Sequence, residues 1–108
     1  MKAIKRNGPL YVTFNEGIRL ANGTDITPAS LEDIFELRDN GVLVGINTAT
    51  SLYSAADKKI TIYPDSAFKS GSTVTLKLLS NKIEDLFGIE RNVPVTKEFC
   101  VENYCEPL

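Results

Sequence analysis

The sequence contains no histidine and no tryptophan, and each absence excludes a kind of site. Without histidine the chain cannot assemble a Ser-His-Asp or Cys-His nucleophilic centre, and it has no imidazole ligand for a metal. Without tryptophan, the tyrosines are the amphipathic aromatic side chains left to stack against the faces of sugars. We therefore expect no catalytic residues, no metal and no cofactor.

Strong charge and long apolar runs are also missing. The formal net charge is −2, from 12 basic and 14 acidic residues, which gives no electrostatic footprint for nucleic acid. The longest nearly apolar run, residues 42–46, has the length of a strand and is far too short to cross a bilayer. The charged N-terminus is followed by no apolar region of the kind that a signal peptide requires. We therefore expect no nucleic-acid partner and no direct insertion into a membrane.

Cysteine is scarce, since Cys100 and Cys105 are the only 2 in the chain. A single C-x4-C spacing without histidine is a poor zinc site, because zinc requires about four ligands. In an exported protein a small-ring disulfide is expected, whereas in a cytosolic protein the two would be free thiols. Cys100 has outward parity in the last alternating run, so a bond to Cys105 would attach the tail without distorting the core. Such a small ring would stabilise the fold by about 2 kcal/mol.

What the sequence does contain is period-two alternation. At 108 residues the chain has the length of one domain. Short runs in which every second residue is apolar are separated by turn residues. The apolar rows are Leu10, Val12 and Phe14; Phe35 and Leu37; Val42, Val44 and Ile46; Ile60 and Ile62; Val74, Leu76 and Leu78; and Val93, Val95, Phe99 and Val101. One apolar row and one mostly polar row in each run are typical of antiparallel sheets with one face on a core.

The residues between these runs predict turns. Asn40-Gly41 lies between two alternating runs, and both residues tolerate the positive φ that a tight type I′ hairpin turn requires. Asn22-Gly23 is a weaker turn signal, because its flanks are less apolar.

Helix is predicted only in single turns. Thr27 can cap one turn with Pro28 at its first position, and residues 81–87 can form another. Neither is long enough to cross over between parallel strands.

The pattern as a whole predicts an all-β fold. We expect an Ig-like β-sandwich of about seven antiparallel strands in a Greek-key arrangement over residues 8–101. Residues 1–7 would then be a leader or linker and residues 102–108 a C-terminal tail.

The order of the segments resembles a known family, the bacterial immunoglobulin-like domain of the SbsA (S-layer protein) type. In the first matching stretch an alternating run reaches Phe14 and is followed by a small polar residue and Glu16. The last matching stretch contains an Asp85-x-x-Gly88 turn. The resemblance covers four stretches, residues 10–18, 57–64, 68–76 and 83–88. Family members often have asparagine where this chain has Ile89, and the two cysteines are outside the usual pattern.

The resemblance implies a non-catalytic structural or spacer module of a larger bacterial cell-surface or secreted protein. Its partners would be the neighbouring domains of that protein, its location extracytoplasmic, and its isolated form a monomer. The family shares no catalytic residues, so none is transferred to this chain. An adhesion or glycan- or protein-binding module is the alternative, and an accessory domain of an exported hydrolase is a more remote one.

Two tyrosines are the candidate ligand contacts for the binding alternative. By alternation Tyr11 and Tyr63 point away from the core, where their rings could stack on a sugar. Exposed tyrosines are also common on strands, because they pair well across neighbouring strands. Adjacent acidic pairs such as Glu32-Asp33 are expected to be solvated rather than catalytic.

Overall fold

The computed structural model describes residues 2–86 and 94–101. Within them, short strands dominate and helix is confined to one continuous stretch before β4. The elements in chain order are β1 (Lys2–Ile4), β2 (Leu10–Thr13), β3 (Ile18–Leu20), the 3-10 helix η1 (Pro28–Ser30), α1 (Leu31–Ile34), β4 (Phe35–Asp39), β5 (Val42–Val44), β6 (Leu52–Ser54), β7 (Lys59–Ile62), β8 (Thr73–Leu78), β9 (Ile83–Asp85) and β10 (Val95–Val101).

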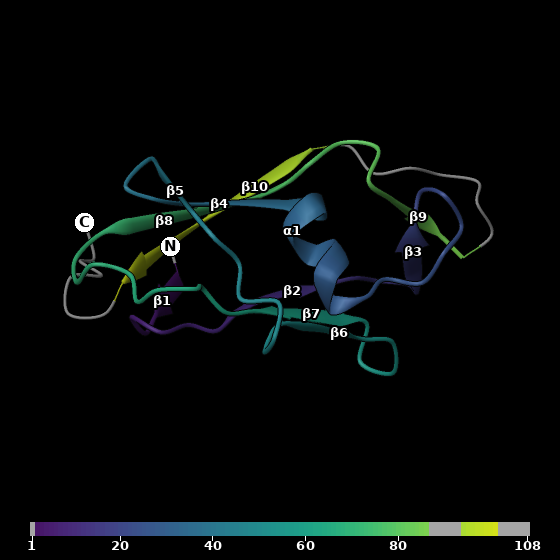
Figure 1. The fold of residues 1–108 in the computed structure, drawn as a ribbon, viewed down its shortest axis with the longest axis horizontal. Coiled ribbons are helices and arrows are strands. Elements are labelled where there is room, and N and C mark those ends of the chain that lie inside the picture. Colours follow the sequence, from purple (N-terminus) through teal and green to yellow (C-terminus); the bar gives the residue numbers. More distant parts are fainter. Residues whose placement is uncertain (1, 87–93, 102–108) are drawn as a thin grey trace.

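The strands form two facing layers (Figure 1). A five-stranded sheet has the order β1-β10-β8-β4-β5, and a three-stranded sheet has the order β2-β7-β6. A short antiparallel pair, β3-β9, lies toward one end of the molecule. The predicted all-β sandwich is thus confirmed, with one parallel pair, β1-β10, among antiparallel neighbours.

Strand β1 is an edge strand of the five-stranded sheet. Lys2 is opposite Phe99 and Ile4 is opposite Val101 in a parallel ladder, and Ile4 is only 8% exposed. The sequence alone predicts a leader or linker over residues 1–7. The structure differs because three residues are too few to show alternation, and their pairing with β10 is visible only in three dimensions.

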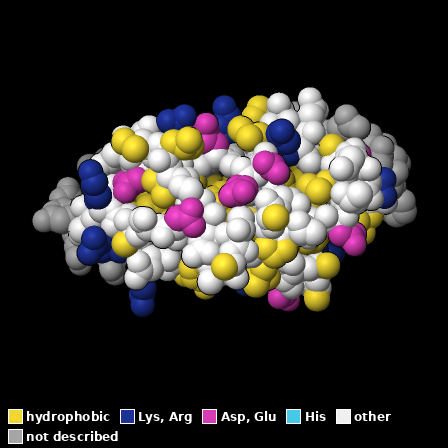
Figure 2. All heavy atoms as spheres, viewed as in Figure 1, with side chains coloured by type: hydrophobic (Ala, Val, Ile, Leu, Met, Phe, Trp, Pro, Cys, Tyr) yellow, Lys and Arg dark blue, Asp and Glu magenta, His cyan; other side chains and the backbone are white. Residues whose placement is uncertain are grey.

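The core lies between the two sheets and consists of their inward rows. Val12, Ile62, Leu76 and Phe99, which alternation predicted to meet in a shared interior, belong to one buried cluster. Sheet register explains this, because cross-strand partners such as Leu10 and Ile62, both 0% exposed, point to the same side. On the face shown in Figure 2, by contrast, apolar side chains are dispersed among polar ones, and acidic side chains lie across the middle.

Among the described residues of the predicted apolar rows, two are not in the core, and Val93 of the last row lies outside the described residues. Val42 is 67% exposed, because it follows the turn at the free end of the β4-β5 hairpin, on the outermost strand of its sheet. Val95 is 43% exposed, because β1 pairs with β10 only from Phe99 onward and leaves the first part of that strand uncovered. Alternation predicts the face of a strand, and the neighbours decide whether that face is buried.

The predicted hairpin turn is confirmed. Asn40 and Gly41 have φ values of 49° and 84°, and they connect Asp39 to its partner Val42. These are the positive values that a type I′ turn requires.

One of the two predicted helical turns is present. Thr27 caps η1, and its backbone N–H donates to the Ser30 hydroxyl at 3.2 Å. The helical turn predicted within residues 81–87 is wrong, because Ile83–Asp85 is strand β9, antiparallel to β3. Gly88 of the Asp85-x-x-Gly88 turn lies outside the described residues.

Candidate functional site

The outer face of the three-stranded sheet carries the tyrosines that the sequence suggested as ligand contacts. Tyr11 on β2 and Leu52 on β6 are both cross-strand partners of Thr61 on the central strand β7. Cross-strand partners point to the same side of a sheet, so the three form one row across the outer face. Tyr11 is 42% and Leu52 is 47% exposed, so the row presents an aromatic ring and an aliphatic group to solvent.

A lysine holds the ring of Tyr11 in place. The Lys59 ammonium lies 4.7 Å from the centroid of that ring, within the range of a cation–π contact. Lys59 is the partner of Thr13 on β2, so it lies on the same outer face, next to Thr61. The contact orients the Tyr11 ring and puts a positive charge beside it.

Tyr63 follows β7 on the same outer side, because Ile62 before it is completely buried. It is half-buried, and its backbone is fixed on both sides. Its N–H donates to the Ser51 hydroxyl at 2.9 Å, and its carbonyl accepts a bond of 2.8 Å from the Asn47 N–H. The predicted outward parity of both tyrosines thus fits the register of the sheet, while their role as ligand contacts stays a prediction.

The other two tyrosines do not add to this face. Tyr53 packs partly against the core, and its hydroxyl accepts a hydrogen bond of 3.2 Å from the Ile18 N–H. Tyr104 lies outside the described residues.

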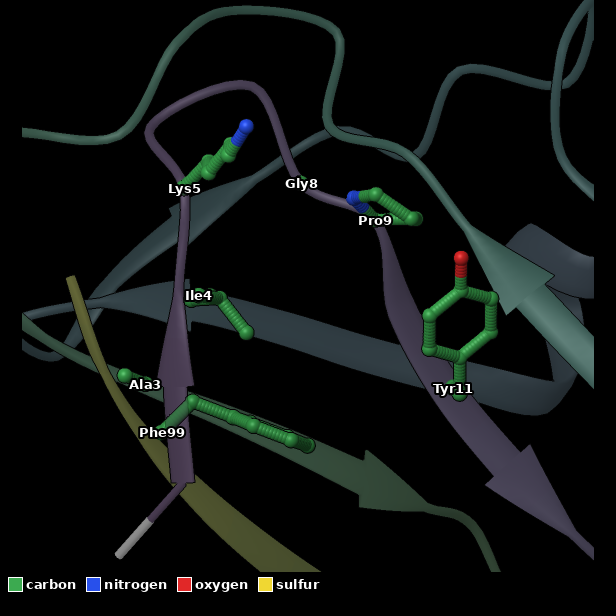
Figure 3. Close-up of a pocket in the computed structure, with 7 residues that line it drawn as sticks. All are labelled: Ala3, Ile4, Lys5, Gly8, Pro9, Tyr11 and Phe99. Atoms are coloured by element: carbon green, nitrogen blue, oxygen red, sulfur yellow. The ribbon is translucent and has the colours of Figure 1, made fainter. Parts of the chain in front are cut away.

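A pocket of about 270 Å³ opens beside Tyr11, at the seam where the two sheets meet. Figure 3 shows Ala3 and Ile4 on β1, followed by Lys5, on one side, and Tyr11 on β2, preceded by Pro9, on the other. Phe99 of β10 lies between them, beneath β1. The lining is mostly apolar, with Lys5 at the turn between the two strands. No carboxylate is among the residues that line this pocket, and its ionisable side chains are Lys5 and Tyr11.

Two carboxylates of the described residues have partners that fix local structure. Glu84, 6% exposed, accepts a bond of 2.7 Å from the Arg19 guanidinium across the β3-β9 pair. Asp57 accepts a hydrogen bond of 3.2 Å from the Ser54 hydroxyl in the turn between β6 and β7. Within residues 2–86 and 94–101, no three acidic or cysteine side chains gather as a metal site would require.

The pKa of Glu36 departs from the ordinary value of a glutamate side chain. A hydrogen bond from Arg38 holds the pKa of Glu36 below its ordinary value, against a smaller opposing effect of burial. A lowered pKa keeps this carboxylate charged, which suits an ion pair and not a proton donor.

Comparison with protein families settles the family to which this fold belongs. The model of the bacterial Ig-like domain matches residues 2–100, which is nearly the whole chain. The chain belongs to the bacterial Ig-like domain family. No curated protein matches the sequence.

The region that matches the family includes β1, in agreement with the pairing of that strand in the sheet. The match includes Lys2–Ile4 and ends one residue before the last residue of β10. In the described part of this Ig-like domain, neither short helix has the length or the apolarity to cross a bilayer.

The predicted disulfide of the Ig-like domain involves one described residue. Cys100 is the register partner of Ala3 on β1 and of Thr73 on β8, and it is 7% exposed. It is not a member of the core cluster, in keeping with its outward parity. Cys105 lies outside the described residues, so the bond stays a prediction. Alkylation without reductant followed by mass spectrometry checks it, since two alkylated cysteines would contradict it.

Proposed function

We propose that this Ig-like domain is a non-catalytic structural spacer in a larger bacterial cell-surface or secreted protein. Domains of its family occur in extracellular bacterial proteins. The resemblance of residues 10–18 and 57–64 to SbsA-type domains supports the finer assignment to modules of that kind.

The pairing of the first and last strands is the observation that carries the proposal. β1 and β10 are parallel, with Lys2 opposite Phe99 and Ile4 opposite Val101. Tension applied through the two ends of the domain would pull these strands in opposite directions along their length. All the hydrogen bonds of the ladder would then be loaded together in shear, and none could be peeled off before the others. A spacer that carries tension between neighbouring domains needs this arrangement.

The chemistry of the surface supports the same role. In the part of the chain that the structure describes, the buried carboxylate Glu84 has its guanidinium partner, and no carboxylate, cysteine or serine lines the seam pocket beside Tyr11. A non-catalytic module is therefore the economical interpretation.

Single-molecule force spectroscopy on a tandem of identical domains tests the spacer. Each domain should unfold in one step that releases roughly 350 Å, from about 3.5 Å for each residue between Lys2 and Val101. Removal of residues 1–7 should lower the unfolding force, because it deletes the sheared ladder. Ile4→Ala is the milder variant if the deletion prevents folding, and Val42→Ala on the remote edge strand is the matched control. Equal unfolding forces for Ile4→Ala and Val42→Ala would contradict the mechanical role.

The outer face around Tyr11 favours a second candidate, a module that binds glycans. The row of Tyr11, Thr61 and Leu52 presents two exposed apolar side chains and is flanked by Lys59, and aromatic rings stack on the apolar faces of sugars.

A glycan array probed with the isolated domain tests this second candidate. Binding that is lost in Tyr11→Ser and Tyr63→Ser but retained in the control Val42→Ser would support it. Binding that survives both tyrosine substitutions would exclude this face as the site.

A further inference from the structure

Glycine follows asparagine at three places in the chain, which are Asn7-Gly8, Asn22-Gly23 and Asn40-Gly41. In such a pair the backbone nitrogen of the glycine can attack the amide carbon of the asparagine side chain, because glycine has no side chain that shields this nitrogen. All three asparagines are exposed, so exposure alone does not distinguish them. The hydrogen bonds of each asparagine and the surroundings of each glycine do.

The side chain of Asn22 is folded back over its own backbone. Its Oδ1 accepts hydrogen bonds from the Thr24 N–H at 3.0 Å and from the Thr24 hydroxyl at 2.6 Å. The ring of atoms that the first of these bonds closes contains both the Asn22 Cγ and the Gly23 nitrogen, which are the two atoms that must join. The two donors also draw electron density from Cγ and stabilise the negative charge that develops on Oδ1 during attack, as an oxyanion hole does.

The surroundings of Gly23 leave room for this reaction. The residue is exposed, and a Cβ atom placed on it would meet nothing within 4 Å apart from its chain neighbours. Its N–H donates a bond of 2.9 Å to the Leu20 carbonyl. This bond must open before the nitrogen can lose its proton, but it joins residues only three positions apart in the same turn. Solvent can therefore reach the attacking nitrogen after a small local movement.

The fold restrains Asn40 by joining it to strand β8. The Asn40 N–H donates to the Thr73 carbonyl at 2.9 Å, and the Asn40 Oδ1 accepts from the Thr73 N–H at 2.9 Å. Rotation of this side chain toward the Gly41 nitrogen would break a contact between the β4-β5 hairpin and β8. The reaction at Asn40 therefore requires the loss of a bond between distant parts of the chain.

The fold restrains Asn7 through its glycine. Gly8 is buried, and a Cβ atom placed on it would lie 3.2 Å from the Pro64 ring and 3.4 Å from the Ile62 carbonyl oxygen. Its N–H donates to the Lys5 carbonyl at 2.9 Å. Because this glycine is enclosed, solvent does not reach its nitrogen and the backbone has little room to turn.

We propose that Asn22 is a site of spontaneous deamidation in the folded domain, promoted by Thr24, and that the fold protects Asn7 and Asn40 from the same reaction. The Gly23 nitrogen loses its proton to solvent and bonds to the Asn22 Cγ, the Cγ–Nδ2 bond breaks, and ammonia leaves with a proton taken from water. Water then opens the cyclic imide at either of its carbonyls and gives aspartate or isoaspartate. The net reaction consumes water, releases ammonia and involves no oxidation. It puts a new negative charge on the turn, and it is independent of both proposed roles of the domain.

Peptide mapping by mass spectrometry tests the proposal with water as the reagent. The folded domain is incubated in mildly alkaline buffer made with water enriched in heavy oxygen, and it is then digested by an acid protease in ordinary water. Solvent oxygen therefore marks only the product formed during the incubation. Asn22 should acquire the label about tenfold faster than Asn40, whose reaction first requires release of the bond to Thr73, and Asn7 should also lag behind Asn22. In concentrated urea the three should react at similar rates, because the differences in hydrogen bonding and burial are lost.

Removal of the hydroxyl donor provides the matched comparison. Thr24→Val deletes the bond from the hydroxyl to the Asn22 Oδ1, and it should slow the labelling of Asn22 about fivefold in the folded domain but not in urea. Thr61→Val, which makes the same change on the central strand β7, should leave the rate at Asn22 unchanged. Labelling of Asn7 or Asn40 as fast as that of Asn22 in the folded domain would overturn the proposal. So would a difference among the three that persists in urea, or equal rates at Asn22 in Thr24→Val and Thr61→Val.

Discussion

Two valines of the same sheet provide the sharpest test of where the core lies. Val74 on β8 and Val42 on β5 both belong to apolar rows in the sequence, yet Val74 is 0% and Val42 is 67% exposed. Val74 lies between Asp39 and Phe99 in the interior of the sheet, whereas Val42 follows the turn of the edge hairpin. The substitutions Val74→Ala and Val42→Ala make the same chemical change in these two environments.

The expected difference follows from burial. Replacing valine by alanine removes two methylene equivalents, each worth about 0.8 kcal/mol when completely buried. The cavity left in a rigid core adds to this, so Val74→Ala should lower the free energy of unfolding by about 2–3 kcal/mol. Val42→Ala loses at most a third of the transfer term and some β-propensity, and should cost less than about 1 kcal/mol.

Urea denaturation followed by circular dichroism measures both values. A domain of this size is expected to have a stability of about 5–15 kcal/mol, so the loss at Val74 is large enough to resolve. The midpoint for Val74→Ala should fall by roughly 1–2 M urea with an unchanged slope, because the surface exposed on unfolding hardly changes. Equal shifts for the two variants, or a larger shift for Val42→Ala, would refute the arrangement of the two sheets.

Further predictions concern the ion pairs and the hairpin turn. Arg19→Gln should lower the free energy of unfolding by about 1–3 kcal/mol, since it removes the guanidinium partner of the buried Glu84; an unchanged urea midpoint would contradict this. Gly41→Ala should cost about 1–2 kcal/mol in the same assay, because φ at this position is 84°, and a neutral result would argue against the type I′ turn. In Arg38→Gln the pKa of Glu36 should rise toward its ordinary value, as measured by NMR titration. Because the folded-state pKa is lowered, the stabilisation from this pair is present above the unfolded-state pKa and is lost as the pH falls through the folded value; a Glu36 pKa that does not move would exclude Arg38 as the cause.

The features that the sequence predicts well are those that depend on local chemistry. Asn40-Gly41 forms the expected turn because asparagine and glycine tolerate positive φ in any surroundings. The cap at Thr27 forms because its hydrogen bonds join residues only three positions apart. The sandwich itself follows from alternation repeated in many runs, and an error in one run does not change the class of fold.

The features that the sequence misses depend on distant neighbours. Residues 81–87 suggested a helical turn, but Ile83–Asp85 pairs with β3, more than sixty residues earlier in the chain, and forms a strand. The candidate site shows the same limit. Alternation placed Tyr11 and Tyr63 on outward faces, but the order of β2, β7 and β6 in the sheet adds Leu52 and Lys59 beside them. No local signal in the sequence connects these residues.

Strand β10 shows that the exposure of a side chain in this domain depends on which strands pair beside it and not on the type of side chain. Cys100 is 7% exposed on the outward side, because β1 and β8 flank it, while the inward Val95 is 43% exposed, because β1 does not reach it. The hydrophobic free energy of burial thus depends on how far a short neighbouring strand extends. The two halves of β10 therefore differ in exposure although they share one alternating pattern.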